Sequence, residues 1–276
     1  MSGVLRNTDQ LLRIMATLRD PDLGCPWDQK QDFDSLIPYL LEETHEVVDA
    51  IERQDYKDLE EELGDLLLQV VFHSQLAAEK ELFDFESVAG RIGDKLTRRH
   101  PHVFAGVEYD NDEQRSAAWE QAKADERQQK AIVRDSDASS ILDGVAQSLP
   151  ALMQAEKLQS RAARHGFDWQ DAAPVFDKVL EELEEVREAF DSGDGQHIRE
   201  EIGDLLFVAV NLARHMSVEP ETALRASSRK FSQRFKYIEK CVAAQNRSLD
   251  DCELDELDAL WDEAKVMLPK FKKRTE

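Results

Sequence analysis

An acidic motif that occurs twice at a constant offset is the strongest constraint on this chain. The first copy reads Glu42-Glu43-Thr44-His45-Glu46 and, after a short turn, Glu62-Leu63-Gly64-Asp65. The second reads Glu181-Glu182-Leu183-Glu184-Glu185 and then Glu201-Ile202-Gly203-Asp204, and each position lies 139 residues after its counterpart, as Asp204 does after Asp65. In a chain of 276 residues, such a duplication favours two similar domains over one large domain.

The composition is typical of helices. Gly 11 and Pro 8 are low counts, and charged residues make up 34% of the chain. Apolar periodicity predicts helices over 8–18, 33–53, 59–79, 85–99 and 116–130, and again over 152–164, 175–190, 198–216, 222–243 and 254–267. No segment resembles a strand, so we predict an all-α fold of two tandem helical-bundle domains built from antiparallel helices.

A polar segment between the copies is the expected linker. Residues 131–145 are rich in Ser and Asp, so we predict an N-terminal domain over 1–130 and a C-terminal domain over 146–276. No stretch approaches the roughly 18 apolar residues that span a bilayer, and the N-terminus lacks a signal pattern. Three cysteines without metal-site spacing suggest reduced thiols, so we expect a cytoplasmic protein that does not bind membranes.

The net charge of −23 argues against a partner that is duplex nucleic acid, because such binders need a cationic surface. The charge also conflicts with a small anionic substrate, unless the acids bind a metal and the metal binds the phosphates. For most of the 58 acids, solubility is a sufficient explanation.

The repeated carboxylates have the spacing of a metal site. Residues three and four apart share one helix face, and like charges there destabilise a helix by about 0.2–0.5 kcal/mol a pair. A short turn between two helices lets their acidic faces converge. Carboxylate oxygens prefer hard cations, Mg²⁺ above all, with Mn²⁺ as a substitute. The candidate sets are Glu182, Glu185, Glu201 and Asp204 in the second copy, and Glu43, Glu46, Glu62 and Asp65 in the first.

The pattern Glu-Glu-x-x-Glu, followed by Glu-x-x-Asp, resembles the signature of the MazG-type, all-α nucleoside triphosphate pyrophosphohydrolases in their tandem form. Supporting stretches are Gly24-Cys25-Pro26-Trp27-Asp28, Arg98-Arg99-His100-Pro101-His102-Val103-Phe104 and Gly203-Asp204-Leu205-Leu206-Phe207. The resemblance covers nearly the whole chain. It implies metal-dependent cleavage of nucleoside triphosphates to NMP and pyrophosphate, and a homodimer of helical bundles.

The resemblance also implies roles for basic and aromatic residues of the second copy. Lys230 and Arg234, four apart, match the family's phosphate-binding pair, and Trp261 and Lys265 would lie near the base and a phosphate. Their alternative roles are a core anchor for Trp261 and solvated helix charges for the others. The full set of expected substrate-binding residues is Lys178, Glu181, Asn211, Lys230, Arg234, Trp261 and Lys265.

The two copies differ where a substrate would be held. Lys178 and Asn211 of the second copy correspond to Tyr39 and Phe72 of the first. The second copy therefore has a cation and an amide where the first has two aromatic rings. We expect the second copy to be the main catalytic site, with the first copy weaker or supporting assembly.

Two other interpretations fit parts of the sequence. A ferritin-like di-metal oxidase needs Glu-x-x-His on two helices, but only Glu42 with His45 has this spacing, because Glu184 stands in the matching position. A helical, metal-dependent regulatory or interaction protein without turnover would have no use for Lys230, Arg234 and Trp261. The seven histidines form no obvious ligand set and are interpreted as surface or packing residues.

Overall fold

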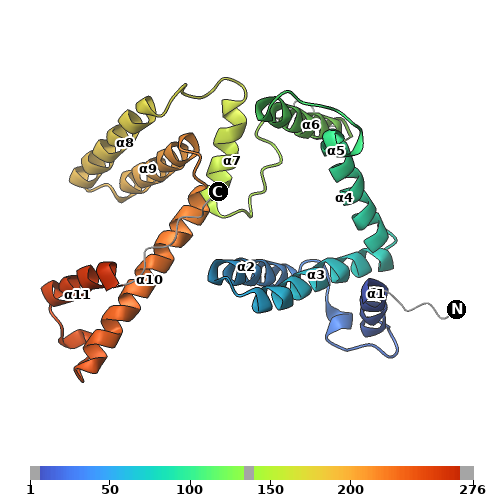
Figure 1. Ribbon diagram of the computed structural model, residues 1–276, viewed down its shortest axis with the longest axis horizontal. Coiled ribbons are helices and arrows are strands. Elements are labelled where there is room, and N and C mark those ends of the chain that lie inside the picture. Colours follow the sequence, from blue (N-terminus) through green and yellow to red (C-terminus); the bar gives the residue numbers. More distant parts are fainter. Residues whose placement is uncertain (1–6, 134–139, 268–276) are drawn as a thin grey trace. The chain divides into compact units, whose positions relative to one another are not determined.

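The computed structural model describes residues 7–133 and 140–267, and all regular structure within these two ranges is helical (Figure 1). The predicted all-α class is confirmed. The chain forms two compact units, Met1–Asp135 and Ser136–Glu276. Within the described ranges, none of the helices combines the length and apolarity needed to cross a membrane.

Unit 1 contains the first copy of the motif. Its helices are α1 (Asn7–Leu18), the short 3₁₀ helix η1 (Asp28–Lys30), α2 (Ile37–Arg53), α3 (Tyr56–Glu79), α4 (Phe85–Arg99), α5 (Pro101–Phe104) and α6 (Asp112–Val133). The helices α2 and α3 pack together as a hairpin. Gln54 ends α2 in the left-handed conformation, and the Asp55 side chain caps α3 by accepting from the Asp58 N–H at 3.2 Å.

Unit 2 repeats this hairpin with α8 and α9. Its helices are α7 (Ala151–Ala163), α8 (Ala173–Ser192), α9 (Gly195–His215), α10 (Pro220–Ala244), the 3₁₀ helix η2 (Leu249–Asp251) and α11 (Leu254–Met267). Gly193 supplies the left-handed residue after α8, at φ 71°, and Asp194 caps α9 by accepting from the Gln196 N–H at 2.9 Å.

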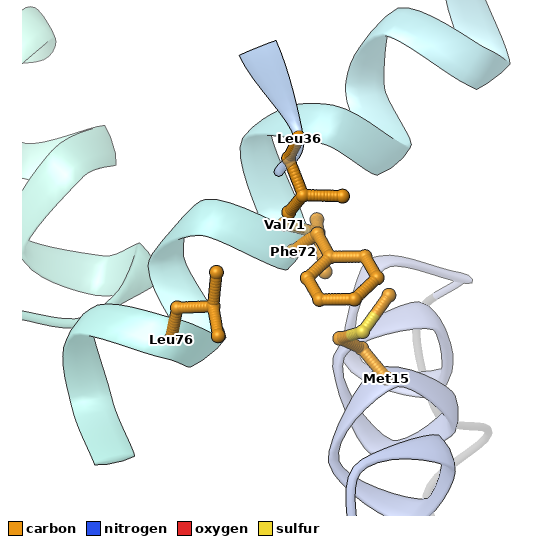
Figure 2. Packing of buried hydrophobic residues seen from close by; sticks show 5 residues of the cluster. All are labelled: Met15, Leu36, Val71, Phe72 and Leu76. Carbon is orange, nitrogen blue, oxygen red and sulfur yellow. The ribbon is translucent and has the colours of Figure 1, made fainter. Parts of the chain in front are cut away.

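The core of unit 1 lies where α1, the start of α2 and the second half of α3 meet. Met15, Leu36, Val71, Phe72 and Leu76 are each at most 3% exposed, and Figure 2 shows the Met15 side chain beside the Phe72 ring. Val71 and Phe72 of the apolar run after Asp65 therefore face the core, while Leu67 and Val70 of the same run are exposed, and the acidic residues at the head of α3 lie outside the core. In unit 2, Val175, Val208, Val210, Ile238 and Val242 are buried in the same way.

The helix bounds differ from those predicted at several places, and α3, for example, begins at Tyr56 rather than at residue 59. Pro38 lies in the first turn of α2, so that helix begins at Ile37 rather than at residue 33. The Asp194 cap starts α9 at Gly195, three residues before the predicted position. Helix α6 begins at Asp112 and continues to Val133, so the first residues of the predicted 131–145 linker are helical. Residues 134–139 of that linker lie outside the described residues.

Candidate metal and nucleotide site

Three carboxylates converge on the α8–α9 hairpin of unit 2. Glu182, Glu201 and Asp204 each offer an oxygen, and these oxygens lie within 4.8 Å of one another. Glu201 and Asp204 share one face of α9, because they are three residues apart. The hairpin turn brings that face against α8, where Glu182 lies. The structure thus brings together three of the four acids predicted for this copy.

Glu182 is the buried member of this trio. Its exposed fraction is 4%, and its Oε2 has no hydrogen-bond partner within the described parts of the chain. Its Oε1 lies 2.7 Å from Lys178 Nζ. An unpartnered carboxylate oxygen in a buried position is costly unless a cation or a donor reaches it.

Two basic side chains border the trio. Lys178 Nζ lies one turn before Glu182 and also pairs with Glu181 at 2.8 Å, and these acids raise the pKa of the lysine. His197 Nε2 lies 3.1 Å from Glu201 Oε1, again one turn before its partner. Each helix of the hairpin therefore places a basic group four residues ahead of a carboxylate of the trio.

Glu185, the fourth predicted ligand, lies outside the trio. Desolvation raises the pKa of its carboxyl group, and the negative charges of Glu182 and Glu201 act in the same direction, while Lys178 opposes them. A carboxylate beside the trio with a raised pKa is suited to accept a proton.

The first copy forms a similar trio on the α2–α3 hairpin. Glu43, Glu46 and Glu62 have carboxylate oxygens within 4.8 Å of one another. Desolvation is the main cause that raises the pKa of Glu43, followed by the charge of Asp65. Asp65, the fourth acid predicted here, is thus near enough to act on Glu43, although it is outside the trio.

The first trio has no basic neighbours equivalent to those of the second. Tyr39 occupies the position of Lys178, and its ring packs against Trp27 at 5.7 Å. Asp58 occupies the position of His197 and adds to the raised pKa of Glu62, whose main cause is desolvation. Phe72, at the position of Asn211, is buried in the core, with the Arg19 guanidinium 5.5 Å from its ring centroid. The asymmetry expected from the sequence therefore extends to one further position, His197 against Asp58.

Four of the seven predicted substrate-binding side chains, Lys230, Arg234, Trp261 and Lys265, lie on α10 and α11. The Trp261 ring is 5.3 Å from the Phe231 ring, and Arg234 Cζ is 5.3 Å from the Trp261 centroid. Lys265 pairs with Asp262 at 2.6 Å, and Lys230 is exposed. No ion pair joins these cations to the acidic trio in residues 140–267, and α11 lies beside α10, apart from α8 and α9 (Figure 1).

Trp119 on α6, the counterpart of Trp261 on α11, packs against the end of α4. Its ring is 4.8 Å from His100 and 5.5 Å from Arg99 Cζ, whereas the position matching Arg234 is Lys95. Four or five residues are about 6–8 Å along a helix. Pro101 ends α4 here, while α10 continues to Ala244. In the first copy the tryptophan therefore lies beside residues four and five positions after Lys95, the counterpart of Arg234.

Asn211 forms a network at the end of α9 with Arg214 and Asp168, neither of which was predicted as a site residue. Asn211 Oδ1 accepts from Arg214 Nη2 at 2.8 Å, and Arg214 also pairs with Asp168 in the loop before α8. His197 was likewise missed, since it was interpreted as a surface or packing residue. Its spacing of four from Glu201 was the available signal, whereas nothing in the sequence showed that Asp168 would meet Arg214.

The donor sets fit a hard divalent cation. All candidate ligands are carboxylates, three converge in each unit, and the Glu182 oxygen without a partner is what an added cation would satisfy. Thiol and imidazole ligands, which softer metals prefer, are absent from both trios.

Comparison with known proteins finds one domain family twice. The MazG nucleotide pyrophosphohydrolase domain matches residues 31–104 and 170–238, which include all eight predicted metal ligands. The chain is 48% identical over 265 residues to an Escherichia coli K12 protein named nucleoside triphosphate pyrophosphohydrolase, covering 95% of this chain and 98% of that protein. It is 42% identical over 260 residues to a Thermotoga maritima protein named nucleoside triphosphate pyrophosphohydrolase/pyrophosphatase MazG, covering 93% and 95%. It is also 41% identical over 253 residues to the uncharacterised protein YabN of Bacillus subtilis, of which it covers 50%.

Proposed function

The chain belongs to the MazG nucleotide pyrophosphohydrolase family, and on that premise we propose that it hydrolyses nucleoside triphosphates to NMP and pyrophosphate, chiefly with its second copy. It is a hydrolase that acts on nucleoside triphosphates, as its relatives are named. The observation that supports this site best is the convergence of Glu182, Glu201 and Asp204 around a buried carboxylate oxygen without a partner. A broad range of bases is expected.

We infer that Mg²⁺, or Mn²⁺ in its place, is held by Glu182, Glu201 and Asp204, with Glu185 as the fourth carboxylate of the set. When bound, the ion would neutralise phosphate charge and make water a better nucleophile. Glu43, Glu46, Glu62 and Asp65 form the corresponding second site in unit 1.

The side chains around the trio then act on the phosphates and on the water. Lys178 pairs with Glu182 and Glu181. When Glu182 instead binds a metal cation, the Lys178 ammonium group can hold a phosphate oxygen. A carboxylate oxygen of Glu185 accepts the proton of the attacking water, a role to which its raised pKa is suited. Lys230, Arg234 and Lys265 stabilise the leaving pyrophosphate, and Trp261 lies against the base.

We propose that the protein acts as a cytoplasmic homodimer. Leu180, Leu183 and Leu206 on α8 and α9 are 65%, 50% and 54% exposed, which is apolar surface that a second copy would cover. Because α11 lies apart from α8 and α9, and no ion pair joins Lys230 or Arg234 to the trio within residues 140–267, the partner's α10–α11 pair is a candidate source of cations for the site. Light scattering tests the dimer, and mixing inactive Glu201→Gln chains with inactive Arg234→Ala chains tests for recovered activity in hybrid dimers.

The deciding experiment identifies the products. Purified protein is incubated with ATP, GTP, CTP and UTP in Mg²⁺, and the products are separated by ion-exchange chromatography. NMP and pyrophosphate are expected, and excess EDTA should abolish both. NDP and phosphate as first products would refute the proposed bond cleavage. Nucleotide binding without any product would favour the alternative, a helical, metal-dependent regulatory or interaction protein.

A further inference from the structure

The end of α9 holds a polar network that connects the α7–α8 loop to Asn211. Arg214 Nη1 and Nη2 donate to the two carboxylate oxygens of Asp168 at 2.8 and 2.5 Å. Arg214 Nη2 also donates to Asn211 Oδ1 at 2.8 Å. His215 Nε2 lies 3.0 Å from Asp168 Oδ1, so the carboxylate is held from two sides. The Arg214 side chain is 17% exposed and that of Asp168 22%, so the network is partly open to solvent.

This network fixes which end of the Asn211 amide is free. A guanidinium group has only donors, so the amide end that faces Arg214 must be the oxygen. The Asn211 NH₂ group then points away from Arg214, and it has no hydrogen-bond partner within residues 140–267. Asn211 follows Asp204 by seven residues, which is two helical turns on nearly the same face and about 10 Å along the axis.

We propose that Arg214, held by Asp168, is a positioning residue that presents the Asn211 NH₂ group to an acceptor oxygen or nitrogen on the nucleoside part of the substrate. This inference rests on the proposed function. With a cation bound, the trio of carboxylates would hold the phosphate end of a nucleotide, so a donor two turns farther along α9 would face the ribose and base. An asparagine held by an arginine keeps one rotamer and one amide orientation. Its NH₂ group can then donate to the substrate without a loss of side-chain entropy at binding.

The first copy supplies a comparison for this network. There, Arg19 after α1 donates to Glu79 of α3 at 2.7 and 2.6 Å, so the charges of the pair are exchanged between loop and helix. The Arg19 guanidinium lies over Phe72, which has no amide to orient. An arginine–carboxylate pair thus joins the same two elements in both units, but only in unit 2 does it contact an amide on the site face.

The test compares Asn211→Ala, Arg214→Ala and the double variant in the full-length protein, with Arg19→Ala as the matched control. We measure kcat and KM for ATP, the Kd of α,β-methylene-ATP by calorimetry, and the Ki of tripolyphosphate, which lacks a nucleoside. Loss of one hydrogen bond should raise KM and Kd about tenfold in each single variant, with little change in kcat. The double variant should be no worse than either single one, because both remove the same contact. The Ki of tripolyphosphate should stay within about twofold.

Additive losses in the double variant, or an equal rise in the Ki of tripolyphosphate, would overturn the proposal. Arg214→Lys retains a donor for Asn211, so its KM should lie between those of wild type and Arg214→Ala. If the Arg214→Ala protein does not fold, Arg214→Lys takes its place in the comparison. Arg19→Ala should lower Tm without changing KM, which separates stability from positioning. If the wild-type chain hydrolyses no nucleotide, the proposed function fails, while the Kd values still test the contact. If the wild type is active and the variants keep their KM and Kd, only this inference fails.

Discussion

Lys178 Nζ lies 2.7 Å from the buried Glu182 Oε1, so a lysine occupies part of the carboxylate cluster that we assign to a metal. The lysine is the counter-charge that permits a buried glutamate without a cation. In the first copy, Tyr39 stands at this position and Glu43 has no such partner, which is consistent with the raised pKa of Glu43. The two copies therefore stabilise similar acidic clusters by different means.

Replacing Lys178 by Met should have opposite effects on metal binding and on turnover. Loss of a positive charge beside the trio should tighten Mn²⁺ binding by up to about fivefold. Loss of a phosphate contact should lower kcat/KM by about ten- to a hundredfold. Calorimetry with Mn²⁺ and steady-state kinetics check the two effects, and Tyr39→Phe is the control in unit 1. A kcat/KM that stays within twofold of wild type would show that Lys178 has no role toward substrate.

The second prediction compares equivalent acids in the two copies. Glu201→Gln or Asp204→Asn should remove most activity, whereas Glu62→Gln or Asp65→Asn should cost at most a few-fold. Because each change relieves repulsion in the metal-free protein, Tm in EDTA should stay level or rise. Equal losses from Glu62→Gln and Glu201→Gln would mean that the copies are equivalent or form one joint site. A marked drop in Tm would instead favour a structural role for the acid.

The helices and the acidic clusters were predictable because they depend on local patterns. Spacings of three and four residues place Glu201 and Asp204 on one face, and a short turn brings that face to Glu182, so the trio follows from the sequence. The position of Glu185 outside the trio depends on the rotation of α8 against α9, to which the spacing is insensitive. The sequence identified Trp119 and Trp261 as counterparts, but not that Trp119 on α6 packs against the end of α4, whereas Trp261 on α11 packs beside Phe231 and Arg234 of α10.

Contacts between distant segments were not predictable in the same way. The Arg214–Asp168 pair joins residues 46 apart, and Arg19–Glu79 joins residues 60 apart. The chain has 35 basic and 58 acidic residues, so the sequence alone offers far more possible pairs than the fold can form. Only the packing of the loop before α8 on the end of α9 selects Asp168 for Arg214.

The third prediction concerns the contact between α4 and α6 in unit 1. Glu126 accepts from Arg99 and Arg98 at 2.5 Å each, which lowers the pKa of Glu126 to about 2. Glu126→Gln should destabilise unit 1 by about 1–3 kcal/mol, since Arg99 is 15% exposed and loses its charged partner. Thermal unfolding measures the loss. Nucleotide turnover at a temperature where both proteins are folded should be unchanged, and a large loss of kcat would show that this contact serves the active site.

The last prediction uses the acids whose pKa is raised. Glu43, Glu62 and Glu185 all have a pKa above the ordinary value of 4.5, mainly through desolvation and then through their acidic neighbours. The folded protein therefore holds protons that the unfolded chain has released. The associated stability is fully present below the ordinary value and is lost as the pH rises through the raised pKa. Glu126, whose pKa is lowered, has the opposite sign and loses its contribution only when the pH falls from 4.5 toward about 2.

In EDTA, Tm should consequently fall as the pH rises from about 5 to about 7. Mg²⁺ or Mn²⁺ favours the charged carboxylates, so the Tm gained on adding metal should be larger at about pH 7 than at about pH 5. Histidines also titrate in this range. The informative quantity is therefore the difference in Tm, at each pH, between wild type and the double variant Glu43→Gln, Glu185→Gln. That variant should show a flatter pH dependence in EDTA and a smaller gain from metal. If the Tm of wild type and the Tm of the variant fall in parallel as the pH rises, the acidic clusters are not the source of the pH dependence. The cation sites assigned to these clusters then lose this support.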